Sequence, residues 1–223
     1  MPFLTQAARP STRLALHLFK PTTIRSLAAM SMSTISDAIK KDHQEIKTYA
    51  ENIRTATDDD SKVRWQNQFT WELARHSIGE ELVVYPAFAK HLGAKGQEMA
   101  DKDRDEHQSV KDLLYKFQKL SPTDPSFTPT LEAIMADLTE HITGEENDDL
   151  PTLEKALERE DSESMAKSFG RTKAFVPSRS HPSAPNKPPF ETAVGLMTAP
   201  IDHLGDLFRK FPDKTVSPNP STK

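Results

Sequence analysis

Two histidines in this sequence each precede a glutamate by four residues: His76 precedes Glu80, and His141 precedes Glu145. Side chains four residues apart lie on one face of an α-helix, so each pair would present an imidazole and a carboxylate together. Neutral imidazole nitrogens and carboxylate oxygens suit iron, manganese and zinc. Two further histidines occupy comparable positions in their own segments. The complete set of candidate metal ligands is His43, His76, Glu80, His107, His141 and Glu145.

Each of these six residues stands where the helical pattern of its segment calls for an apolar side chain. A lone histidine at such a position is usually a hydrogen-bonded core residue, and a lone glutamate could mark a misread helix phase. Burying a polar group without a partner costs roughly 1 to 3 kcal/mol, whereas a whole domain is stable by only about 5 to 15 kcal/mol. Six such residues in one core therefore need a shared compensation, which two cations with bridging carboxylates would supply.

Four segments in the middle of the chain have the periodicity of amphipathic helices and carry the six candidate ligands. The first begins after Ser33 or Thr34, which are both good N-caps. The second ends near Gly93, which suits a helix C-terminus, and the third ends before the prolines of residues 121–125. Pro151 kinks or ends the fourth. Short connections between four such helices predict an all-α fold, an up-down-up-down four-helix bundle.

The order and spacing of the six residues resemble those of the hemerythrin HHE cation-binding domain. Local similarity extends over residues 41–46, 76–86, 105–110 and 141–146, and the resemblance covers about residues 35–157. It implies a four-helix bundle that holds two irons bridged by carboxylates, with dioxygen, iron or nitric oxide chemistry. The C-terminal tail also resembles that of fungal HHE proteins, which suggests a fungal source.

The sequence departs from the oxygen-carrying hemerythrins at two places. Those proteins have a fifth histidine four residues after the one on the third helix, and here that position is Lys111. Their last carboxylate is an aspartate five residues after its histidine, whereas here Glu145 and Glu146 fill the fourth and fifth places. One iron would lose a nitrogen ligand, and water, Glu81, Glu146 or another carboxylate could replace it. Fewer nitrogen ligands favour iron sensing, storage or redox chemistry over reversible oxygen carriage.

The ends of the chain differ in composition from the middle. The N-terminal stretch has arginines and lysines but no acidic residue before Asp37, as mitochondrial presequences do, so we expect a mitochondrial protein. The alternative is a cytoplasmic protein with an untargeted N-terminus. The predicted stretches are a basic leader at 1–33, the bundle at 34–157, a helical extension at 158–172 and a Pro-rich tail at 173–223.

The tail contains too many apolar residues for a solvated linker. They predict a short helix that docks, either on its own bundle or on a partner or membrane surface. These apolar residues do not identify a protein partner. The apolar residues of the tail are Phe190, Val194, Leu196, Met197, Ile201, Leu204, Leu207, Phe208 and Phe211.

Composition excludes several other functions. The chain has no cysteine, so disulfides, zinc ribbons, iron–sulfur clusters and thiol nucleophiles are impossible. A net charge of −4 provides no global positive field for nucleic acid, and no apolar run reaches the ~20 residues of a transmembrane segment. Hydrolase triads and nucleotide-binding loops are also absent from the sequence. The sequence therefore favours a metal-binding protein over an enzyme with an organic substrate.

Three functional hypotheses follow. The first is a non-haem di-iron protein that binds or senses dioxygen, peroxide or nitric oxide, with manganese or zinc as possible substitutes for iron. The second is an iron storage or sensing protein whose folding depends on metal and which performs no catalysis. The third is a metal-free helical interaction module. Tyr85 could tune oxygen chemistry, but we expect it to be a packing residue with a satisfied hydroxyl.

Overall fold

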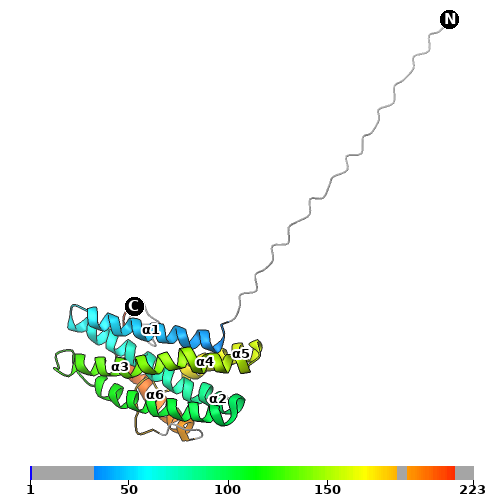
Figure 1. Cartoon of the computed structure of the whole chain (residues 1–223). Helices are drawn as coiled ribbons and strands as arrows, with labels where there is room; N and C mark the ends of the chain where they lie inside the picture. Colours follow the sequence, from blue (N-terminus) through cyan, green and yellow to red (C-terminus); the bar gives the residue numbers. More distant parts are fainter. Residues whose placement is uncertain (2–32, 185–189, 214–223) are drawn as a thin grey trace. The chain divides into compact units, whose positions relative to one another are not determined.

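The structure is a computed structural model that describes Met1 and residues 33–184 and 190–213, with side chains described from Met197 in the last range. Figure 1 gives its helices in chain order. The basic leader, and the mitochondrial targeting inferred from it, lie outside the described residues and stay predictions.

Helix α1 (Ile35–Thr55) begins at a capping box. The Asp37 amide donates to Thr34 Oγ1 over 3.2 Å, and the Thr34 amide donates to Asp37 Oδ2 over 3.1 Å. Two amide groups that have no partner within the helix are satisfied in this way. Thr34 is therefore the N-cap, one of the two residues predicted for that position.

Helix α2 (Asp59–Phe117) is a hairpin of two helical arms. Gly93 interrupts it with φ 63° and ψ −138°, a conformation that a residue with a Cβ rarely adopts. The Phe69 ring lies 6.0 Å from the Phe117 ring, and the Tyr85 ring lies 5.4 Å from the His107 ring, so the arms run antiparallel. The second and third predicted helices are these two arms, and the chain reverses at the predicted break.

The fourth side of the bundle is a rod built from α3 (Phe127–Gly144), a π-helical turn η1 (Glu145–Asp149) and α4 (Leu150–Ala156). In the π turn the Leu150 amide donates to the Glu145 carbonyl, five residues back. Pro151 follows at the start of α4, where its missing amide costs little. The helix therefore continues past Pro151, and the change in its hydrogen bonding lies just before this proline.

The predicted four-helix bundle is confirmed. Its sides are α1, the two arms of α2 and the rod from α3 to α4 (Figure 1). Helix α5 (Arg159–Phe175) packs against α1 and α2. No helix within the described residues is long and apolar enough to cross a membrane.

The tail contributes helix α6 (Phe190–Asp206). Residues that follow α6 reach α2, because Arg64 donates to the Phe211 carbonyl over 2.9 Å and Asn67 donates to the Lys210 carbonyl over 3.0 Å. The Phe211 side chain is buried. However, other apolar residues that were predicted to dock remain exposed in this structure: Met197, Ile201, Leu204, Leu207 and Phe208.

Candidate metal centre

The six candidate ligands form a polar layer between two apolar clusters of the bundle core. On α1, for example, His43 lies between Ile39 of one cluster and Ile46 of the other. Each of the six side chains is at most 2% exposed. None of them is therefore a solvent-facing residue that was assigned to the wrong face of its helix. The first cluster includes Ile46, Leu73, Val110 and Leu138, and the second includes Ile39, Val84, Ala100 and Leu150.

Two groups of three residues could each hold one ion, and both include Glu80. One group is His43, His76 and Glu80; the other is Glu80, His107 and His141, with ligand atoms within 4.8 Å of one another in each group. Glu145 adds a second carboxylate, since its Oε2 lies 3.3 Å from His43 Nε2 and 3.9 Å from His141 Nε2. The structure thus brings all six residues together, and their role as ligands stays a prediction.

Several polar atoms at the middle of this cluster are buried without a hydrogen-bond partner. The His76 Nε2 atom lies 3.3 Å from Glu80 Oε2, but the two do not form a hydrogen bond. These nitrogen and oxygen atoms can all bind a metal ion. Because they lack hydrogen-bond partners, they fit a bound cation better than a structural hydrogen-bond network. The unsatisfied atoms are His43 Nε2, His76 Nε2 and both carboxylate oxygens of Glu80 and of Glu145.

All four histidines have a carboxylate against their outer nitrogen, Nδ1, including His107, whose partner is Glu81. A hydrogen bond at Nδ1 fixes the ring and leaves Nε2 as the atom that can bind metal. Of the residues that supply these carboxylates, the sequence had indicated only Glu81 and Glu146, as possible replacements for the missing ligand. The other three contacts are His43 with Glu146 at 2.8 Å, His76 with Asp42 at 3.3 Å and His141 with Glu106 at 2.9 Å.

His107 has a different environment, which involves the lysine at the position of the missing fifth histidine. Its Nδ1 lies 3.2 Å from Glu81 Oε1, and Lys111 Nζ donates to Glu81 Oε2 over 2.5 Å. Its Nε2 lies 3.0 Å from the Tyr85 hydroxyl and 3.2 Å from His141 Nε2. Glu81 is therefore engaged by His107 and Lys111 in this structure. Tyr85 packs in the core as predicted, but its hydroxyl also borders the candidate centre.

Burial and the neighbouring charged groups together determine the charge of this cluster. Burial lowers the pKa of His76 well below its ordinary value and that of His107 to about 4, so both imidazoles are neutral at pH 7. Burial, with the nearby Glu145 charge, raises the pKa of Glu80 well above its ordinary value. Burial also opposes ionisation of Glu145, but His43 and the other imidazoles lower its pKa to about 2. The neutral imidazoles of His76 and His107 and the ionised carboxylate of Glu145 are in the protonation states that bind a cation.

Helix α5 supports the centre from outside the bundle. The Phe169 ring lies edge-on to the His76 ring with centroids 6.1 Å apart. A Cβ atom on Gly79 would lie only 2.7 Å from Phe169 Cε2, so this close approach requires glycine. Lys173 donates hydrogen bonds to Asp42 and to Glu72. Lys173 and Asp42 lie 131 positions apart, so no local sequence pattern could have linked them.

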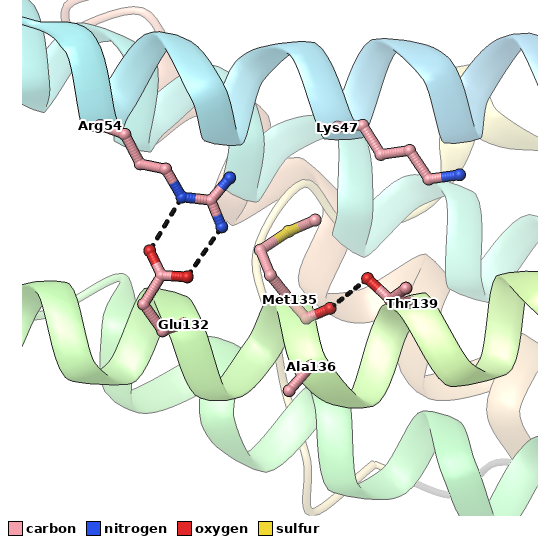
Figure 2. A pocket seen from close by; sticks show the side chains of 6 residues that line it. All are labelled: Lys47, Arg54, Glu132, Met135, Ala136 and Thr139. Atoms are coloured by element: carbon pink, nitrogen blue, oxygen red, sulfur yellow. Dashed lines mark hydrogen bonds and ion pairs between the residues drawn. The ribbon is translucent and has the colours of Figure 1, made fainter.

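A separate pocket of about 480 Å³ lies between α1 and α3. Figure 2 shows its lining, in which Arg54 donates two hydrogen bonds to Glu132, over 2.8 and 2.9 Å. The Thr139 hydroxyl donates to the Met135 carbonyl over 2.6 Å. None of its lining residues belongs to the six candidate ligands, so this pocket is distinct from the candidate metal centre.

Comparison with known proteins shows what this chain is related to. The family model for the hemerythrin HHE cation binding domain matches residues 34–153. An uncharacterized hemerythrin-like protein of Schizosaccharomyces pombe is 57% identical over 186 residues, which cover 83% of this chain and 92% of the relative. A crystal structure of a hemerythrin HHE cation binding domain-containing protein from Mycobacterium kansasii matches with a TM-score of 0.53 and 20% identity, over 64% of this chain and 89% of that chain. This structural likeness supports the fold alone, whereas the family model and the close relative support membership of the family. With its histidine and glutamate groups gathered in one core, the chain belongs to the hemerythrin HHE cation-binding domain family.

Proposed function

We propose that this chain is a non-haem di-iron protein that reacts with or senses dioxygen, peroxide or nitric oxide. The observation that carries the proposal is the pair of three-residue groups that share Glu80. A shared carboxylate suits two neighbouring cations, because each of its oxygens can bind one of them. The donors are imidazole nitrogens and carboxylate oxygens with no thiolate, which favours iron, with manganese or zinc as possible substitutes.

The chain's own residues would determine what such a centre can do. Iron supplies binding and redox chemistry for small oxygen or nitrogen ligands. With two histidines in each group, positions remain for a small ligand. The neighbouring apolar clusters exclude water, and the Tyr85 hydroxyl can donate a hydrogen bond inside the site. Carboxylates at Nδ1 keep all four rings oriented.

Metal content and optical spectra of the purified full chain test this proposal. We expect about two irons per chain, from the two groups, with charge-transfer absorption that changes when the reduced protein meets oxygen, peroxide or nitric oxide. The double substitution His76→Ala/Glu80→Ala should remove both metal and absorption. His91→Ala, a histidine outside the cluster, is the matched control and should retain them. A wild-type chain that neither contains nor binds iron would refute the proposal and support a metal-free helical interaction module.

A second candidate function is iron storage or sensing through metal-dependent folding. The link from His76 through Asp42 to Lys173 favours it, because this link connects a candidate ligand to helix α5. Iron removal should then loosen α5 and expose it to protease. The measurement is limited proteolysis with and without iron, and identical cleavage in the two states would count against metal-dependent folding.

A further inference from the structure

A third group of possible ligands borders the candidate centre. It consists of Asp103 and Glu106 on the second arm of α2 and His141 on α3, with ligand atoms within 4.8 Å of one another. His141 connects the two places. Its Nδ1 lies 2.9 Å from Glu106 Oε2, and its Nε2 lies 3.2 Å from His107 Nε2 on the inner side. This group therefore stands one imidazole ring away from the six candidate ligands.

Asp103 is the unusual member of this group. Its side chain is only 1% exposed, and neither carboxylate oxygen has a hydrogen-bond partner. A buried carboxylate normally accepts several hydrogen bonds or contacts a cation at close range. Burial raises the pKa of Asp103 to about 7, which agrees with this lack of donors.

The lysine that faces the two carboxylates of this group is loosely placed. Lys102 Nζ lies 2.7 Å from Glu106 Oε1 and 3.6 Å from Asp103 Oδ1. The Lys102 side chain is 60% exposed, so it can move into solvent at little cost. The Glu106 side chain is 31% exposed, whereas Asp103 is buried, so the carboxylates lead from the surface towards His141.

We propose that Asp103 and Glu106 form an auxiliary site for a hydrated divalent cation, through which metal reaches the centre. Two carboxylates suit an ion that keeps several of its water molecules, and such binding is weaker than binding by the inner histidines. Lys102 moves away when the ion arrives, and the Nδ1–H group of His141 continues to donate to Glu106. The delivery role rests on the di-iron function proposed above.

The test is the rate at which the metal-free full chain takes up Co²⁺, followed by its visible absorption. Asp103→Asn, which keeps the side-chain shape, should slow uptake about tenfold while the final amount of bound Co²⁺ stays the same. Lys102→Met should accelerate uptake because the competing ammonium is gone. Lys116→Met makes the same charge change at an exposed position on α2 and should leave the rate unchanged.

The possible outcomes separate the two proposals. Equal rates in the wild type, Asp103→Asn and Lys102→Met, with normal final Co²⁺ content, would overturn the auxiliary site and leave the metal centre intact. A wild-type chain that takes up no Co²⁺ at all would overturn both. If Asp103→Asn fails to fold, Lys102→Met still decides, because its side chain is mostly in solvent.

Discussion

Glu145 and Glu146 contact the two nitrogens of a single imidazole: Glu145 Oε2 lies 3.3 Å from His43 Nε2, and Glu146 Oε1 lies 2.8 Å from His43 Nδ1. Consecutive residues of a regular α-helix point about 100° apart and do not normally reach one ring. Here the π turn that starts at Glu145 changes the winding of the helix locally. Such turns are frequent at functional sites. The tandem glutamates thus have different roles, one inside the cluster and one outside it.

Glu146→Ala should weaken metal binding without removing a ligand. Loss of its contact frees Nδ1 of His43, so the ring is no longer fixed, and metal affinity should fall about 10- to 100-fold. The measurement is competition with a chelator of known affinity. Glu140→Ala, an exposed glutamate on α3, is the control and should bind metal as the wild type does. An unchanged affinity in Glu146→Ala would contradict the positioning role.

Glu80→Met should abolish metal binding and yet stabilise the metal-free protein. Both oxygens of Glu80 are buried without a hydrogen bond, so an apolar side chain of similar size removes a desolvation cost. We expect the free energy of unfolding of the metal-free chain to rise by about 1 to 3 kcal/mol. Urea denaturation after chelation measures it. A destabilised variant would mean that Glu80 has a structural role.

The elements of the bundle could be predicted from the sequence because local rules determine them. Thr34 caps α1 through its own hydroxyl, and Gly93 alone of the described residues adopts a positive φ. Helical periodicity placed His76 and Glu80 on one inward face, and both are buried there. Each of these features depends on residues within a few positions of one another.

Contacts between distant segments could not be predicted in the same way. Lys111 reaches Glu81 across the α2 hairpin, 30 positions away, and periodicity does not specify such a pair. The π turn was not predicted either, because a regular helical period is compatible with Glu145 or with Glu146 as the buried carboxylate. In α6 the apolar pattern predicted a helix, but it did not reveal that Asp202 and Asp206 would hold the preceding segment through Ser178 and Arg179.

Lys173→Met should destabilise the protein whether or not metal is bound. The Lys173 ammonium lies between Asp42 and Glu72. Its removal leaves these two buried carboxylates without this ion-pair partner. Breaking a buried ion pair costs about 3 to 5 kcal/mol, which thermal or urea unfolding would detect. Lys167→Met changes an exposed lysine on the same helix and should have little effect. Equal stability of the two variants would contradict the role of Lys173.

The stability of the metal-free chain should depend on pH through His107. Burial lowers the pKa of His107 from 6.5 to about 4, so between these values the unfolded chain binds a proton that the folded chain does not. The His107 contribution is therefore complete above about pH 6.5 and is lost as the pH falls to about 4, with a total of about 3 kcal/mol.

His107→Gln isolates this contribution from the rest of the cluster. Glu80 and Asp103 have raised pKa values and act in the opposite direction, so the pH profile of the wild type alone mixes the effects. The difference in unfolding free energy between the wild type and His107→Gln, measured in urea with a chelator, should shift against the wild type on acidification. If that difference is constant between about pH 7 and about pH 4, burial does not lower the pKa of His107.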